Sequence, residues 1–203
     1  MYNNEESYID KRIVRTKSKI KKTFLLLLQQ KPYNKLTITE IVNQSKINRV
    51  TFYNHFDSKE ELLIEIIDDV MKDLVISYRK PYENLNLFTV NDIKPSMLML
   101  FEHVYKYSDF YSTVTNSDIL IELQNRMIDE LKNLALKDFS MINSNIDRVI
   151  YAEWYAYAIY GIILEWIKKG YSHSPKYMAE QLLDLVKSIP KKRVERKGMV
   201  RYS

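Results

Sequence analysis

The chain has 203 residues, of which 46% are hydrophobic and 28% are charged, and its formal net charge is +5. This balance excludes a disordered chain, which lacks the apolar residues needed to offset the entropy cost of ordering. Only three glycines and five prolines are present, which excludes a turn-rich β architecture and predicts an all-α fold. The absence of cysteine excludes disulfides, thiolate nucleophiles and cysteine-ligated zinc, and it favours a reducing cytoplasm.

The first predicted helix runs from about residue 10 to Gln30. Apolar residues recur there in steps of three, four or seven, at Ile9, Ile13, Ile20, Phe24, Leu27 and Leu28. Such steps place them on one face of a helix. Pro32 ends the helix, because proline disfavours helical geometry in the residue before it.

Two short helices separated by a three-residue turn follow. Thr37 and Glu40 form a capping box, in which hydroxyl and carboxylate satisfy free amides at a helix start, and this predicts a helix over 38–45. Asn48 can cap a second helix over 49–55. Two such helices make a helix-turn-helix.

A second capping box predicts a long fourth helix. Ser58 and Glu61 precede a run of apolar residues at helical spacing, and the helix ends near Pro81. A polar loop is predicted from Tyr82 to Asn91. Further apolar helical patterns are expected at about 95–107, 118–139, 145–169 and 176–188.

The charge is distributed unevenly. Residues 11–59 carry a net charge of +10, residues 60–190 carry −7, and residues 191–203 carry +5. A basic segment suits a polyanion, because each neutralised phosphate releases counterions. It is equally compatible with a solvated basic face, and charge alone does not decide between the two.

The run TITEIVNQSKINRVTFYNHFDSKEELL, from Thr37 to Leu63, resembles the DNA-binding region of the TetR family of bacterial transcription regulators. The resemblance covers about residues 11–71. The sequence departs from the family pattern at Lys46, where glycine is common. If this position needs a left-handed backbone, lysine costs about 1 kcal/mol. Trp154 begins a segment that resembles regulators of dihydroxyacetone metabolism more faintly.

The resemblance implies three parts: a DNA-binding domain over 11–71, an effector-binding and dimerisation domain over 72–190, and a basic tail over 191–203. The tail either lengthens the DNA contact or is a mobile solubilising end. The helices at 145–169 and 176–188 are expected to pair with their copies in a homodimer. Such a dimer suits palindromic double-stranded operator DNA.

Candidate DNA contacts lie on the second short helix. Arg49 can bind guanine and Asn54 adenine in a bidentate fashion, and Thr51 is available to the same groove. The resemblance implies phosphate contacts at Thr37, Lys46, Tyr53, His55 and Lys59. Three of these residues have an alternative role: Tyr53 can complete the core, His55 can pack or cap, and Lys59 can pair with an acidic side chain.

An effector pocket is expected among the aromatics of the C-terminal half. The candidate residues are His103, Tyr107, Tyr111, Arg126 and Trp154. The alternative for most aromatics there is packing in the core and at the dimer interface. His103 and His173 lack a partner at metal-ligand spacing, so we expect no metal and no cofactor.

These features predict a cytoplasmic transcription regulator. It is expected to be a repressor that a small-molecule effector releases from the operator, and an activator of the same fold is the alternative. A non-specific DNA-binding protein is the second hypothesis. An enzyme is disfavoured, because no phosphate-binding glycine loop, H-E-x-x-H or G-x-S-x-G motif is present.

No secretory signal is expected. The longest apolar stretch, Tyr151 to Ile167, contains Glu153 and Glu165, so no membrane span is expected.

Overall fold

The computed structural model describes residues 3–82, 93–138 and 146–188, and within them it contains helices and no strand. The all-α prediction is confirmed. The elements are α1 (Asn3–Leu28), η1 (Tyr33–Lys35), α2 (Ile38–Ser45), α3 (Arg49–Tyr53), α4 (Lys59–Arg79), η2 (Lys80–Tyr82), α5 (Ile93–Lys106), α6 (Ser108–Thr115), α7 (Leu120–Asp138), α8 (Arg148–Lys168) and α9 (Pro175–Ser188).

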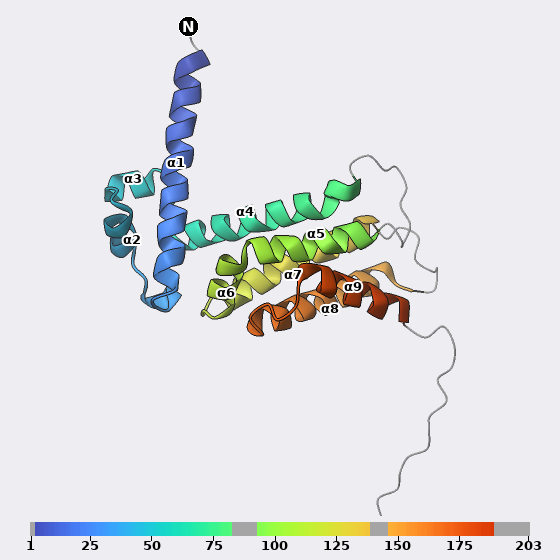
Figure 1. Cartoon of the computed structure of the whole chain (residues 1–203). Helices are drawn as coiled ribbons and strands as arrows, with labels where there is room; N and C mark the ends of the chain where they lie inside the picture. Colours follow the sequence, from blue (N-terminus) through green and yellow to red (C-terminus); the bar gives the residue numbers. More distant parts are fainter. Residues whose placement is uncertain (1–2, 83–92, 139–145, 189–203) are drawn as a thin grey trace, which may run out of the picture.

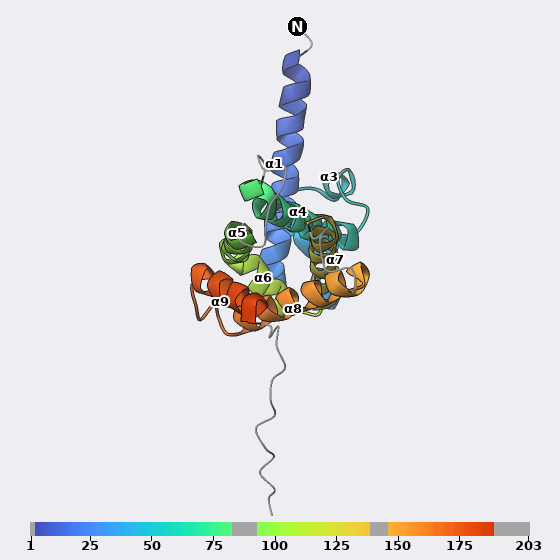
Figure 2. The ribbon, with the colours of Figure 1, turned by 90° about the vertical axis from the view of Figure 1, so that its right-hand side faces the viewer.

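The helices form two groups joined by α4 (Figure 1). The N-terminal group is α1–α3, and α4 runs from it into a bundle made of α5–α9 (Figure 1). In the bundle α4 packs against α5 and α7, α8 packs against α7 and α6, and α9 packs against α5. Seen end-on, α8 and α9 lie together on the side of the bundle opposite to the N-terminal end of α1 (Figure 2).

Most helix boundaries agree with the predictions, but two differ, and one helix was not predicted. The helix α1 begins at Asn3, about two turns earlier than expected. The helix α3 ends at Tyr53, so Asn54 is its C-cap rather than an interior residue. The helix α6 was not predicted, because a single residue, Tyr107, separates it from α5 and no glycine or proline marks the break. Of the loop predicted from Tyr82 to Asn91, Tyr82 is the last residue of η2, and residues 83–91 lie outside the described residues, as does the tail from 191.

Polar contacts at several places join the N-terminal group to the rest of the chain. On one side of α1, Lys17 and Lys21 form ion pairs with Glu65 on α4, each at 2.7 Å. At the far end of α1, Asp118 accepts hydrogen bonds from the amides of Tyr33 (2.8 Å) and Asn34. The N-terminal group is therefore attached to α4 and, separately, to the turn between α6 and α7. Among the described helices, none combines the length and the hydropathy that crossing a bilayer requires.

Candidate nucleic-acid interface

The helices α2 and α3 have the geometry that the local sequence predicts. The side chain of Thr37 accepts a hydrogen bond from the Glu40 amide, and the Glu40 carboxylate accepts one from the Thr37 amide at 2.9 Å. The Asn48 side chain accepts a hydrogen bond from the Thr51 amide at 2.6 Å and so caps α3. Both predicted caps are confirmed, and they fix the direction in which α3 leaves the turn.

The turn between α2 and α3 uses a left-handed residue. Lys46 is the C-cap of α2, with φ 52° and ψ 46°. A lysine in this conformation brings Cβ close to the following carbonyl, whereas glycine has no Cβ to clash. The left-handed conformation anticipated at this position is therefore present.

Replacing Lys46 with glycine is expected to raise the free energy of unfolding by about 1 kcal/mol, because the steric cost of the left-handed backbone disappears. Urea unfolding monitored by circular dichroism measures the change. The matched control is Gln44→Gly, an exposed position inside α2 that has ordinary helical geometry. Glycine there should lower stability by a similar amount, and equal signs for the two variants would contradict the argument.

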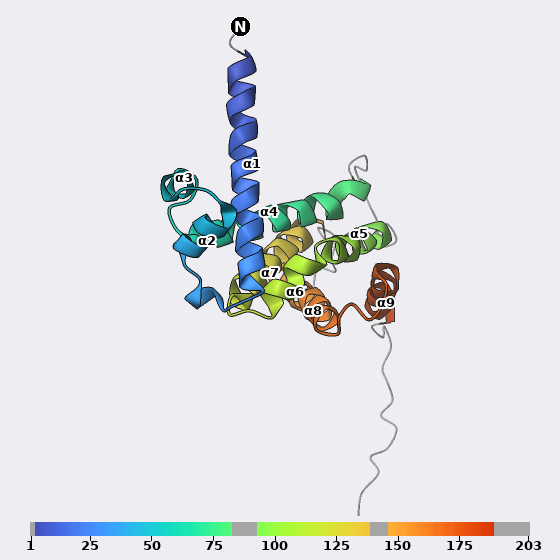
Figure 3. The same ribbon diagram turned by 60° about the vertical axis from the view of Figure 1, so that its left-hand side comes forward.

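The helix α3 has one buried face and one exposed face. Phe52 and, just beyond the helix, Phe56 are almost completely buried, with their rings 5.8 Å apart. Arg49, Val50 and Asn54 are exposed. The α2–α3 pair is seen at one end of the molecule, away from the α5–α9 bundle (Figure 3). A duplex can therefore reach the exposed face of α3 without displacing another described element.

Arg49 lies in a small network on this exposed face. Its guanidinium donates to the Tyr53 hydroxyl at 3.3 Å and to Thr39 Oγ1 at 3.5 Å, and it lies 5.6 Å from the Tyr53 ring centre. Tyr53 is 42% exposed, which excludes the alternative in which it completes the core. His55 is half-buried beside Phe56, so its ring is partly available.

At two of the predicted phosphate contacts, the hydrogen-bond donors already bind acceptors within the protein. The Lys59 ammonium donates to the carbonyls of Tyr33 (2.9 Å) and Leu36 (3.0 Å) and lies 4.3 Å from the Tyr33 ring centre. The Thr37 amide and hydroxyl both donate to the Glu40 carboxylate. These residues therefore hold the start of α2 in place.

Glu40 completes this arrangement. The Lys31 ammonium, the Thr37 hydroxyl and the Thr37 amide all donate to its carboxylate, and they lower the pKa of Glu40 to about 2. The carboxylate is therefore ionised at neutral pH. The capping box of α2 is thus insensitive to pH near neutrality.

Sequence reasoning missed two residues of this surface. Val50 is 69% exposed on α3, although valine is usually buried. An apolar side chain on such a face suits the methyl group of thymine. Thr39 on α2 holds Arg49. The helical position of Val50, away from the face of Phe52, is the signal that could have identified it.

The predicted effector residues are not all together. His103, Tyr107 and Tyr111 form one cluster: the rings of His103 and Tyr107 are 4.7 Å apart, and the Tyr111 hydroxyl lies 3.4 Å from His103 Nδ1. By contrast, Arg126 pairs with Asp68 on α4 at 3.3 Å. Trp154 lines a separate cavity beside α9.

His103 is buried against an acidic residue of α4. Its Nε2 lies 3.5 Å from Asp73 Oδ2, and Lys106 also binds that carboxylate, at 3.3 Å. Burial lowers the pKa of His103 to about 4, although the Asp73 charge acts in the opposite direction. The imidazole is therefore neutral in the folded protein at pH 7.

The buried imidazole should make stability depend on pH between 6.5 and 4. In this window the unfolded chain binds a proton that the folded chain does not, so stability falls as the pH falls. Between pH 7.5 and 5 the loss should reach about 2 kcal/mol, at about 1.4 kcal/mol per pH unit below 6.5. Urea unfolding of the wild type and His103→Gln at both pH values measures it.

The His103→Gln variant should lose most of this pH dependence. Of the charged and titratable groups around His103, Asp73 has a lowered pKa, so it titrates below the window. Tyr107 and Tyr111 have raised pKa values, and that of Lys106 is also raised, so these three titrate above it. An equal loss in wild type and variant would contradict the assignment.

The outer faces of α8 and α9 carry exposed apolar side chains and two cavities. Ile150, Trp154 and Tyr157 are exposed on α8, and Tyr177 and Leu185 are exposed on α9. A cavity of about 600 Å³ and one of about 260 Å³ lie against these helices. Ile162 lines both cavities.

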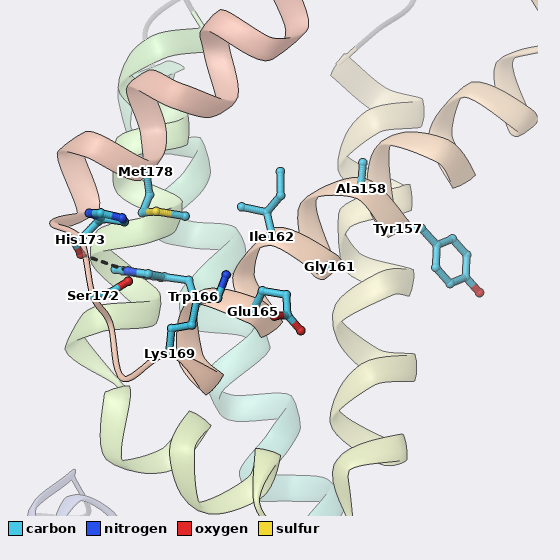
Figure 4. A pocket seen from close by; sticks show the side chains of 10 residues that line it. All are labelled: Tyr157, Ala158, Gly161, Ile162, Glu165, Trp166, Lys169, Ser172, His173 and Met178. Carbon is cyan, nitrogen blue, oxygen red and sulfur yellow. Dashed lines mark hydrogen bonds between the residues drawn. The ribbon is translucent and has the colours of Figure 1, made fainter. Parts of the chain in front are cut away.

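The larger cavity lies where α8 meets the turn into α9 (Figure 4). Trp166 points toward this turn, and its indole N–H donates to the His173 carbonyl at 3.0 Å (Figure 4). Met178 of α9 and Ile162 of α8 border the same hollow (Figure 4). Exposed apolar side chains gathered over two adjacent helices are typical of an interaction surface.

An exposed short helix after a capped turn, on an all-α chain with a basic N-terminal region, defines the class of helix-turn-helix transcription regulators. Two family models match the chain. The model described as "Bacterial regulatory proteins, tetR family" covers residues 25–66, and the one described as "Transcriptional regulator C-terminal region" covers residues 91–188. The chain belongs to the TetR family of transcription regulators.

Known relatives are distant in sequence. The uncharacterised helix-turn-helix regulator YxbF of Bacillus subtilis is 26% identical over 90% of this chain, which spans only 47% of YxbF. The dhaKLM operon activator DhaS of Lactococcus lactis is also 26% identical, over 87% of this chain and 91% of DhaS. A solved TetR-family structure from Syntrophomonas wolfei superposes with a TM-score of 0.67 at 21% identity, covering 85% of this chain and 93% of that one.

Proposed function

We propose that the protein is a cytoplasmic homodimer that binds a palindromic operator through α3 and regulates transcription in response to a small molecule. The observation that carries the proposal is the exposed face of α3, where Arg49, Val50 and Asn54 stand clear of the core. Such a face fits a major groove, in which each base pair presents a distinct set of donors, acceptors and methyl groups.

In this proposal the residues of the N-terminal group have two roles, base recognition and phosphate contact. Arg49, Thr51 and Asn54 read bases, and Val50 adds a contact to a thymine methyl. Lys46, Tyr53 and His55 contact phosphates. Thr37 donates to Glu40, and Lys59 donates to two backbone carbonyls. These two residues bind phosphate only if the hydrogen bonds within the protein are replaced by hydrogen bonds to the DNA.

The dimer forms through the outer faces of α8 and α9. Two copies of this face would bury the exposed aromatic and aliphatic residues and close the cavities between them. Two-fold symmetry then presents two copies of α3 to the same side of a duplex. Half-sites about 34–36 Å apart are expected for such an arrangement.

The proposed effector site is the His103–Tyr107–Tyr111 cluster against Asp73 of α4. An effector that binds better when this contact is rearranged would move α4 and with it the DNA-binding helices, by reciprocal coupling of the two sites. Repression relieved by the effector is the proposed output. Activation is the second candidate, and it is favoured by the name of DhaS, the activator that resembles this chain.

Selection of binding sites from random duplex DNA with the purified protein tests the proposal. The wild type should enrich a palindrome, and Arg49→Ala should lose one guanine preference in each half-site, a discrimination of about 1–3 kcal/mol. The control is Arg126→Ala, which removes an equal charge from α7. No enriched sequence for the wild type would refute the proposed function. Transcript levels of the regulated genes after deletion distinguish repression from activation.

A further inference from the structure

The helix α1 carries a row of cations that the helix-turn-helix does not use. Five exposed basic residues belong to it: Lys11, Arg12, Arg15, Lys19 and Lys22. At about 100° per residue they fall within roughly 100° of arc, so they share one face of the helix. None of them forms an ion pair with another described residue.

The opposite side of α1 is built differently. Lys17 and Lys21 point there and are paired with Glu65 and Asp69 of α4. Lys17 also lies 5.0 Å from the centre of the Phe56 ring. The cations of α1 thus divide into two sets, one that holds the fold together and one that remains available to a partner.

The placement of α1 leaves the available set turned away from the packed helices. Lys17 and Lys21 lie on the side of α1 that contacts α4, so the five exposed cations are on the side turned away from α4 (Figure 1). The N-terminal half of α1 stands clear of the other helices in all three views and points away from α8 and α9 (Figures 1, 2 and 3). In a dimer formed through α8 and α9, it extends outward, away from the partner subunit.

We propose that this basic face of α1, from Lys11 to Lys22, is a second DNA contact that binds phosphates of the duplex flanking each half-site. The inference rests on the proposed function, because α3 must first place the protein on the duplex. The face is about 16 Å long, from eleven rises of about 1.5 Å, and covers about five base pairs. Its ammonium and guanidinium groups form no ion pair with a described residue, so it adds affinity and salt dependence without base preference.

The experiment compares two operators and two triple variants. One duplex is the selected palindrome cut back to its two half-sites, and the other carries ten base pairs of arbitrary sequence on each side. The test variant is Lys11→Gln, Arg12→Gln and Arg15→Gln, changes that preserve helix propensity. The control variant is Lys72→Gln, Lys80→Gln and Lys137→Gln, which removes the same charge from exposed positions elsewhere.

The flanks should raise the affinity of the wild type and the control variant by roughly 10-fold or more at low salt, whatever the flanking sequence. The test variant should gain little, and its salt slope should fall by about 0.9 for each phosphate that it no longer neutralises. The proposal is overturned if the flanks raise the affinity of the test variant as much as that of the control variant, and if the two variants have the same salt slope. If the proposed function itself fails, the result is different, because the wild type would then select no palindrome at all.

Discussion

Replacing Phe52 with alanine is expected to lower the free energy of unfolding by about 3–5 kcal/mol and to abolish operator binding. The ring is fully buried and contacts both Tyr53 and Phe56 edge-on or at a tilt. Alanine would leave a cavity beneath a helix of only five residues, which has few contacts of its own to compensate. Thermal unfolding and binding to the selected palindrome measure the two effects.

The matched control is Val50→Ala on the same helix. Val50 is exposed, so its truncation should change the free energy of unfolding by less than about 0.5 kcal/mol. Any loss of DNA binding by this variant would come from the thymine contact alone. Comparable destabilisation by the two substitutions would mean that α3 does not have one buried and one exposed face.

Replacing Gly161 with arginine is expected to convert the proposed dimer into a monomer. Gly161 lies in the middle of α8 and lines the larger cavity, and a Cβ there would meet nothing within 4 Å in the subunit. Arginine also has a higher helix propensity than glycine, so the monomer should fold at least as well. Operator affinity should fall by roughly 10²–10⁴-fold, because the two half-sites are no longer bound as one unit.

Sedimentation measures the oligomeric state, and binding to a single half-site should be unchanged. Asn125→Arg, an exposed position on α7, adds the same charge away from this face and should remain dimeric. A dimeric Gly161→Arg protein would show that α8 and α9 do not form the interface. A monomer that keeps full affinity for the palindrome would show that dimerisation is not needed for binding.

Local sequence signals predicted the DNA-binding helices well. The capping box at Thr37 and the caps at Asn48 and Ser58 act within three residues, and all are present in the structure. The box predicted at Ser58 is incomplete, because the Glu61 carboxylate accepts from the amide of Asp57 instead of that of Ser58. The departure from the family pattern at Lys46 left open whether this position has a left-handed backbone, and the structure shows that it has one. Such interactions are predictable because both partners are close together in the chain.

Contacts between distant segments were not predictable in this way. Lys59 binds the carbonyls of Tyr33 and Leu36, which lie 26 and 23 residues earlier. Nothing in the sequence around Lys59 distinguishes that arrangement from a phosphate contact. The same holds for the effector candidates, which aromatic density placed in the C-terminal half of the chain. Only the packing of α4, α5 and α6 shows that His103, Tyr107 and Tyr111 form one cluster and that Trp154 lies elsewhere.

The carboxylate of Asp118 has a mechanical consequence for the whole molecule. It accepts hydrogen bonds from two consecutive amides at η1, while α4 contacts α1 through Glu65 and η1 through Lys59. The DNA-binding helices are therefore tied both to the α6–α7 turn and to α4. A displacement of that turn relative to α4 would be transmitted to α2 and α3 through the backbone of η1.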